Sequence, residues 1–267
     1  MVKSVPELKA NARHGLLGHY TIIVIALILT QFISSILSYP AALLTGFIQM
    51  APESALLVNR LIQIPVAVVS TIFTCGWIRM ILKTMRGEKA TYNDITYYLS
   101  HSPLKVIQIV LWIAVYMIPA YIPLAAGILT FYFQMGSPVG TAVLSLGIAA
   151  SLIIAIYIGI QLALSFYLFI DNQNERALSY IKSSITLMKG NRARYLYLMV
   201  SFIGLFLLGL ISFGIGMLWI LPYQQATCAL FYENIRAAKE PPQEQGPDIS
   251  HMNSAADEKD YSQNYWM

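Results

Sequence analysis

Residues 106–170 read VIQIVLWIAVYMIPAYIPLAAGILTFYFQMGSPVGTAVLSLGIAASLIIAIYIGIQLALSFYLFI, and this run of 65 residues contains no Asp, Glu, Lys or Arg. A helix needs about 20 consecutive apolar residues to cross the hydrocarbon core of a bilayer, so the run is long enough to cross twice. FQMGSP at 133–138 supplies Gly and Pro turn residues near its middle. The run therefore predicts two antiparallel membrane-spanning helices joined at 133–138.

Two further uncharged runs flank this one, at residues 20–52 and 195–232. The whole chain is 57% hydrophobic and 11% charged, whereas soluble domains average about 45–50% and about 25%. The composition excludes an ordinary soluble protein. We expect an all-α, polytopic integral membrane protein.

Basic residues in the loops predict how the helices cross. With spans near 20–37, 61–82, 104–122, 141–170, 195–212 and 217–235, all Lys and Arg residues except Arg60 fall on one side. Lys and Arg are retained in the cytoplasm, which predicts six transmembrane helices with both termini cytoplasmic. For the last run, SFGIG at 212–216 is the candidate turn between two rather short helices. A single long helix with a re-entrant end is the alternative, because hydropathy does not resolve so tight a hairpin.

The domain organisation follows from composition. Residues 1–236 form the predicted six-helix transmembrane domain. Residues 237–267 are rich in Gln, Ser, Asn and acids and cannot bury a core, so we expect a disordered cytoplasmic tail. The aromatic residues Tyr261, Tyr265 and Trp266 near its end indicate either a docking or membrane-touching segment or chance composition.

Amphipathic helices are expected on the cytoplasmic face. Asn172 and Glu175 have capping-box spacing, a stripe from Leu178 to Met188 follows at helical spacing, and Gly190 supplies the stop. Such a helix either lies in the interface with its lysines near anionic lipid head groups, or packs its stripe on the bundle. Weaker versions begin at Ser4-x-x-Glu7 and Thr91-x-x-Asp94, so an interfacial helix followed by a hairpin recurs three times as a candidate internal repeat.

A ridge of small residues runs along the fourth predicted span. Gly147, Ser151, Ala155, Gly159 and Ala163 are each four positions apart. Helices in lipid associate through close backbone approach along such ridges. The ridge predicts a packing surface for another span or for a second copy of the chain.

Residues that carry chemistry are scarce. No ionisable residue lies deep in a predicted span, and Asp171 and Glu233 lie at span ends, where a cap or a salt bridge is the ordinary expectation. The chain has no nucleotide-binding loop, zinc-protease motif or nucleophile elbow, and its four histidines form no metal-ligand pattern. We therefore expect no enzyme and no catalytic, cofactor-binding or metal residues. The basic residues are scattered topology signals, so no nucleic-acid partner is expected either.

From Asp171 to Glu233 the chain resembles a family of bacterial integral membrane proteins known only as domain of unknown function 975. The likeness rests on Ser184, LMKGN at 187–191, SFIG at 201–204, GIG at 214–216, Pro222-Tyr223 and Phe231-Tyr232. The family often has Trp where this chain has Leu205. The resemblance implies a bacterial cytoplasmic-membrane protein and brings no known activity or catalytic residues.

The function expected from the sequence is that of a non-enzymatic membrane accessory or scaffold protein, a role compatible with lipid and membrane-protein partners. The alternative is a carrier or channel for a small neutral or amphipathic solute that uses helices broken by Pro119, Pro123 and Pro222. A carrier predicts a polar cavity lined by glutamines such as Gln108, Gln161 or Gln224. A membrane enzyme with unrecognised residues is the third class.

Overall fold

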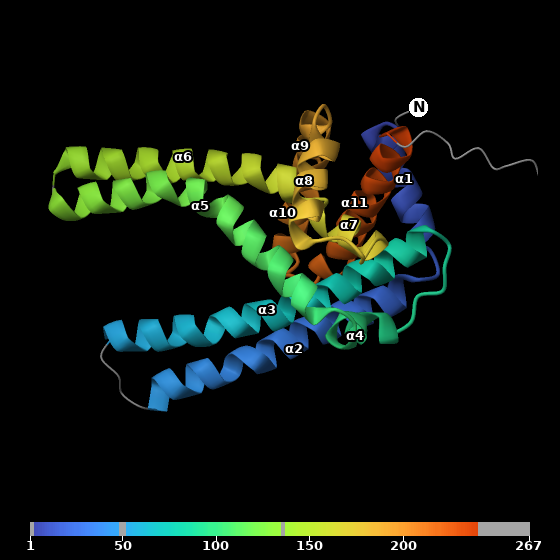
Figure 1. Ribbon diagram of the computed structural model, residues 1–267, viewed down its shortest axis with the longest axis horizontal. Helices are drawn as coiled ribbons and strands as arrows, with labels where there is room; N and C mark the ends of the chain where they lie inside the picture. Colours follow the sequence, from blue (N-terminus) through green and yellow to red (C-terminus); the bar gives the residue numbers. More distant parts are fainter. Residues whose placement is uncertain (1–2, 48–51, 135–136, 240–267) are drawn as a thin grey trace, which may run out of the picture.

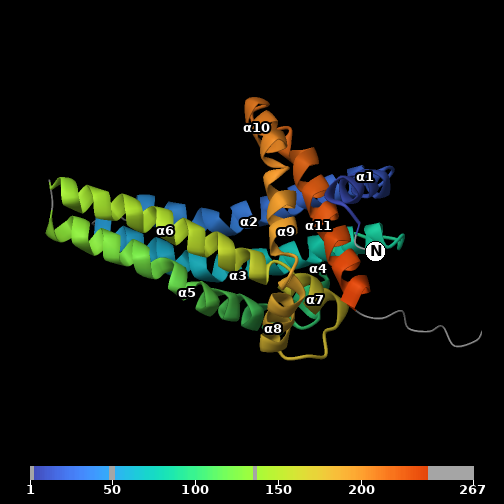
Figure 2. The ribbon, with the colours of Figure 1, turned by 90° about the horizontal axis from the view of Figure 1, so that it is seen from above.

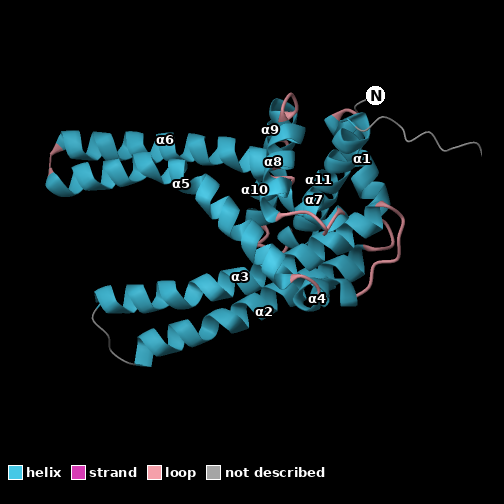
Figure 3. Cartoon of the chain, viewed as in Figure 1, coloured by secondary structure: helices cyan, strands magenta, loops and turns pink. Residues whose placement is uncertain are grey.

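The computed structural model describes residues 3–47, 52–134 and 137–239. Within these ranges every regular element is a helix, which confirms the all-α class (Figure 3). Five segments are long and apolar enough to cross a membrane, which indicates a membrane location; they are Tyr20–Pro40, Ser54–Met85, Pro103–Phe133, Pro138–Asp171 and Arg192–Ile211. The expected sixth span, 217–235, is not among them. The expected tail falls almost entirely outside the described residues.

The first part of the chain is a short helix followed by a hairpin. α1 spans Val5–Leu16, α2 spans Tyr20–Phe47 and α3 spans Pro52–Met85. The two long helices extend about ten residues beyond the expected spans and pass through Pro40 and Pro65. Because a backbone in apolar surroundings satisfies its polar groups only by staying helical, single prolines bend such helices without ending them.

The second part repeats this order. α4 spans Asn93–Ser100, α5 spans Pro103–Phe133 and α6 spans Pro138–Leu162. The turn expected at 133–138 is therefore confirmed. α5 remains a single helix through Pro119 and Pro123. After a bend at 163–164, α7 (Ser165–Asp171) continues the path of α6.

The ridge of small residues packs against α5 of the same chain. A Cβ built on Gly147 would lie 2.6 Å from the carbonyl oxygen of Pro123. Ser151 Oγ donates to the carbonyl oxygen of Ala120 at 2.5 Å. A Cβ on Gly159 would meet only Met117 Cε at 3.8 Å, an ordinary contact. Of these three positions, the close approach to α5 occurs at Gly147 and Ser151 and not at Gly159.

The third part begins with α8 (Ala177–Met188), followed by α9 (Arg192–Val200), α10 (Ile203–Ile211) and α11 (Met217–Lys239). The turn expected at 212–216 is confirmed, since α10 ends at Ile211 and α11 begins at Met217. The order of a short helix followed by a hairpin thus occurs three times. That the three units superpose as an internal repeat stays a prediction.

The three hairpins leave a common base in different directions. Figure 1 shows the α2/α3 and α5/α6 hairpins extending to the same side and diverging from one another. In Figure 2 the α9–α10 segment runs steeply across the direction of both. The main core lies where α11 meets α1, α2 and α3, and it contains fully buried Met80, Ile81, Phe231 and Tyr232.

The short helices pack on the protein through their apolar stripes. Glu7 Oε2 accepts a hydrogen bond from Ser4 N at 2.8 Å, as the capping-box pattern predicts. α1 packs its buried stripe against α11, α3 and α9. α8 buries Ile181 and Met188 and lies against α5, α6 and α7. Of the two alternatives for the α8 stripe, packing on the bundle is therefore the observed one.

The predicted start of α8 is wrong. Asn172 is the C-cap of α7, where its N–H donates to the carbonyl of Leu168. Glu175 instead accepts a hydrogen bond from Ser179 Oγ. α8 begins only at Ala177, because the preceding residues are used to end α7 and to turn the chain. The expected stop is confirmed, since Gly190 has a left-handed φ of 84°.

Candidate functional site

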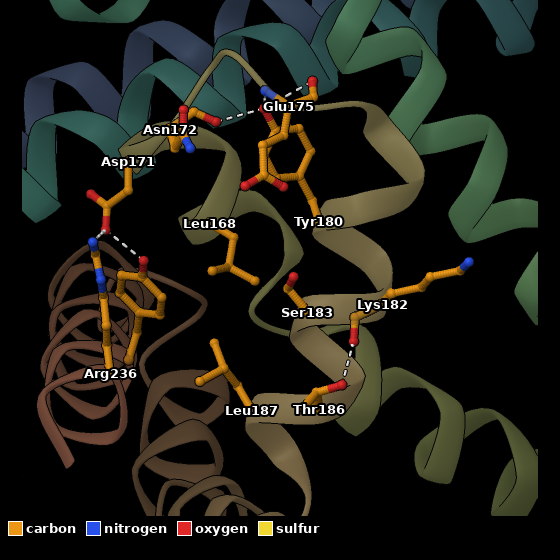
Figure 4. Close-up of a pocket in the computed structure, with 11 residues that line it drawn as sticks. Leu168, Asp171, Asn172, Glu175, Tyr180, Lys182, Ser183, Thr186, Leu187 and Arg236 are labelled. Carbon is orange, nitrogen blue, oxygen red and sulfur yellow. Dashed lines mark hydrogen bonds and ion pairs between the residues drawn. The ribbon is translucent and has the colours of Figure 1, made fainter. Parts of the chain in front are cut away.

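A polar hollow lies between α7, α8 and α11, and we call it the α8 pocket (Figure 4). Its volume is about 430 Å³, within the range of ligand pockets, roughly 300–1,000 Å³. It is lined by Leu168, Asp171, Asn172, Glu175, Tyr180, Lys182, Ser183, Thr186, Leu187, Tyr232 and Arg236.

One wall of the pocket is fixed by a group of charges, which we call the Asp171 cluster: Arg86, Asp171, Tyr232, Glu233 and Arg236. Asp171 Oδ1 pairs with Arg86 Nη2 at 2.6 Å, and Oδ2 accepts hydrogen bonds from Arg236 Nη1 and the Tyr232 hydroxyl. Arg86 Nε also donates to Glu233 Oε1 at 2.8 Å. Of the two alternatives expected at Asp171 and Glu233, a cap or a salt bridge, both residues form salt bridges. Sequence reasoning did not foresee that they share Arg86.

The cluster joins all three parts of the chain. Arg86 follows α3, Asp171 ends α7, and the other three residues lie on α11. The Asp171 side chain is only 6% exposed, while both arginines are about a third exposed. A buried carboxylate is stable only when it is paired and hydrogen-bonded, so the cluster holds the ends of three helices in one arrangement.

A second ion pair fixes α4 on α3. Asp94 Oδ1 lies 2.7 Å from Lys83 Nζ and 3.3 Å from Arg79 Nε, and Oδ2 accepts a hydrogen bond from Thr91 N, one half of the capping box that the sequence predicts. The helix itself begins only at Asn93, with Tyr92 as its N-cap. Burial raises the pKa of Asp94, but the hydrogen bonds from Lys83 and Thr91 and the charge of Lys83 outweigh it. The pKa therefore lies below its usual value.

The approach of α4 to α3 also depends on Gly76. A Cβ built there would lie 2.2 Å from the carbonyl oxygen of Ile95. No other residue type fits at this position without moving α4. Sequence reasoning missed this contact because a single glycine within an apolar run gives no sign of its neighbour.

Several polar groups that line the α8 pocket are hydrogen-bonded within the protein. The Tyr180 hydroxyl donates to the Asn172 carbonyl oxygen at 2.5 Å and accepts from Glu175 N at 3.2 Å. Asp171 already accepts from Arg236 and Tyr232 (Figure 4), and it also pairs with Arg86. Lys182 extends away from Leu168 and Leu187 (Figure 4). The pocket thus combines hydroxyl, amide and carboxylate groups, several of them bonded within the protein, with the apolar side chains of Leu168 and Leu187.

The three glutamines expected to line a carrier cavity have separate surroundings. Gln108 lies in an apolar hollow with Leu111, Trp112 and Val115. Gln161 Oε1 accepts from Arg192, and Gln224 contacts the sulfur of Met199. Among the described residues, no group of three or more His, Cys, Asp or Glu side chains is placed to hold a metal ion.

Comparison with known proteins gives one match. A family model described as "Protein of unknown function (DUF975)" matches residues 1–239. No curated protein and no solved structure matches the chain. The resemblance identified over residues 171–233 therefore extends over the whole described part.

Proposed function

Because the chain belongs to the DUF975 family of proteins of unknown function, we propose that it is a non-enzymatic membrane accessory protein whose α8 pocket receives a short segment of a partner protein. Both termini lie on the cytoplasmic side of a bacterial cytoplasmic membrane in this proposal, and the α8 pocket opens on that side. The sixteen Lys and Arg residues that the expected topology places on one side support this orientation.

The orientation requires an even number of crossings. The chain crosses six times if α11 spans the membrane in addition to the five candidate spans. It crosses four times if the third hairpin enters and leaves the membrane on the same side. α11 is less apolar than the other long helices. Since α1, α2 and α3 cover much of it, it needs fewer apolar residues than a lipid-facing helix would.

The observation that carries the proposed role is the Asp171 cluster beside the pocket. Its carboxylates and arginines bind one another and brace the ends of α3, α7 and α11. A wall held by three elements gives the pocket a fixed shape in the absence of a ligand. Such preorganisation favours binding because less conformational freedom is lost when the partner docks.

A carrier for a small amphipathic solute is the second candidate. The bend of α5, which contains Pro119 and Pro123, favours it (Figure 1). Carrier sites lie near the bilayer midplane, whereas the α8 pocket lies at the base from which the hairpins extend. This difference supports the accessory role.

The test is a pair of substitutions in and just after α8. Ser183→Trp fills the pocket without replacing a member of the Asp171 cluster, and Lys189→Trp places the same side chain at the exposed C-cap of the helix. Native gels of solubilised membranes should show a complex that is lost in Ser183→Trp and kept in Lys189→Trp. Identical complexes in both variants would contradict the proposal. Solute flux into proteoliposomes containing the purified protein would support the carrier instead.

A further inference from the structure

The turn between α10 and α11 projects large apolar side chains from the protein. We call Leu210, Ile211, Phe213 and Ile215 the hairpin tip; all four are exposed, and Phe213 is 97% exposed. The backbone of Phe213 also has a φ of 53°, which lies in the left-handed region. Glycine adopts this conformation at the lowest free-energy cost, because it has no Cβ. A large apolar residue therefore holds the outermost position at a conformational cost.

The backbone of the turn needs no water as a hydrogen-bond acceptor. Every N–H from Ser212 to Ile220 donates within the turn or the adjoining helices. The one polar side chain, Ser212, donates to the Gly209 carbonyl oxygen and accepts from Gly216 N, both at 2.8 Å. A backbone inside hydrocarbon must satisfy its polar groups internally, and the N–H groups of this turn meet that requirement.

The other hairpin turns have a different character. Gln134 is exposed at the end of α5, and Arg60 is exposed within the first turns of α3. Such residues favour a turn in water. From Tyr195 to Tyr232 the third hairpin has no charged residue, as is also true of residues 106–170, and the one polar side chain of its turn, Ser212, is bonded within the turn. Its tip therefore presents no free polar side chain, whereas Gln134 is exposed at the end of α5 and Arg60 near the start of α3.

A contact between α1 and the third hairpin indicates how far this hairpin extends into the membrane. Lys9 Nζ donates to the Ser201 carbonyl oxygen at 2.9 Å and lies 4.1 Å from the centre of the Phe202 ring. A lysine ammonium is expected near the head groups, so Ser201 lies close to that level. The ten residues from there to Ile211 extend about 15 Å, half of a hydrocarbon core of about 30 Å.

From these observations we infer that the third hairpin is re-entrant. Its two limbs enter from the side that carries Arg86 and Arg192, and the hairpin tip ends among lipid acyl chains without reaching the opposite face. The steep angle between α9–α10 and the two long hairpins reduces its depth further (Figure 2). The inference rests on the membrane embedding proposed above, and it gives the chain four full crossings with both termini on one side.

Spin labels at three positions test the inference in the full-length chain. Glu88→Cys marks the loop after α3, Gln134→Cys marks the α5–α6 turn, and Phe213→Cys marks the hairpin tip. Each is labelled in detergent and reconstituted into liposomes. The unsubstituted chain, whose Cys75 and Cys228 are buried, gives the background. Collision with oxygen should exceed collision with a water-soluble nickel complex at Phe213→Cys, and the reverse should hold at the other two positions.

The membrane face from which each cysteine reacts distinguishes the possible topologies. A membrane-impermeant maleimide should reach Glu88→Cys and Gln134→Cys from opposite faces and should not reach Phe213→Cys from either. Reaction of Phe213→Cys on the Gln134 face would show a full crossing, and reaction on the Glu88 face would show a hairpin outside the membrane; both overturn the inference. If Glu88→Cys and Gln134→Cys react on the same face, the topology underlying the proposed function fails instead. Ile215→Cys repeats the test if Phe213→Cys does not fold.

Discussion

Asp171 Oδ1 and Arg86 Nη2 lie 2.6 Å apart, although 85 residues separate them in the chain. This pair connects the end of the α2/α3 hairpin with the end of α7, and Glu233 and Arg236 extend the connection to α11. The three hairpins are therefore tied together at one end.

Asp171→Asn should lower the free energy of unfolding by about 2–3 kcal/mol, because it leaves two arginines without their shared carboxylate. This expected loss of stability is smaller than the loss on breaking a fully buried ion pair, because both arginines are about a third exposed. Thermal unfolding in detergent measures the loss. Glu175→Gln is the control, because Glu175 is exposed and its expected change is below about 0.5 kcal/mol. Equal stability of the two variants would contradict the structural role of the cluster.

Gly76→Ala should destabilise the protein by about 2 kcal/mol or more, since the new methyl group would lie 2.2 Å from the Ile95 carbonyl oxygen and would push α4 from α3. The same substitution at Gly204, where nothing lies within 4 Å, should be neutral or slightly stabilising. The difference in melting temperature between the two variants is the measurement. A Gly76→Ala protein as stable as the Gly204→Ala protein would exclude the close approach.

Gly147→Ala should weaken the contact between α5 and α6, because a Cβ there would lie 2.6 Å from the Pro123 carbonyl oxygen. We expect a loss of about 1–3 kcal/mol. Gly159→Ala lies three turns along the same helix, meets only Met117 Cε at 3.8 Å and should cause no loss. Resistance to unfolding by a denaturing detergent compares them. If Gly159→Ala proves the more damaging, the packing surface lies elsewhere on the ridge.

Asp94 should make stability depend on pH in the acid range. Its pKa in the folded protein is lowered, so its contribution is fully present above the unfolded value of about 3.9 and is lost as the pH falls through the folded value. Asp94→Asn should therefore be less stable than the natural sequence at pH 7, and the gap should narrow below about pH 4. Melting temperatures of both proteins at several pH values provide the test. A gap that stays constant down to pH 3 would contradict it.

The sequence by itself determined the class of the protein and the places where the chain turns. Uncharged runs too long for one crossing require hairpins, and Gly, Pro and Ser at 133–138 and 212–216 fix their turns locally. The polar partners of Ser4 and Thr91 were also predictable, because a capping residue and its acid lie within one helical turn. The start of α8 was not predictable from the sequence, because Asn172 caps the end of α7 instead.

Only the tertiary structure decided which distant residues share a contact. From the sequence, Arg86 could pair with any carboxylate near the ends of the hairpins. It pairs with Asp171 and Glu233 because the packing of α7 and α11 places these two carboxylates beside it. The depth that we infer for the third hairpin likewise rests on the hydrogen bond from Lys9 to Ser201, a contact across 192 residues. Hydropathy measures how apolar each segment is along the chain. It contains no information about direction or depth, which arise from packing between segments.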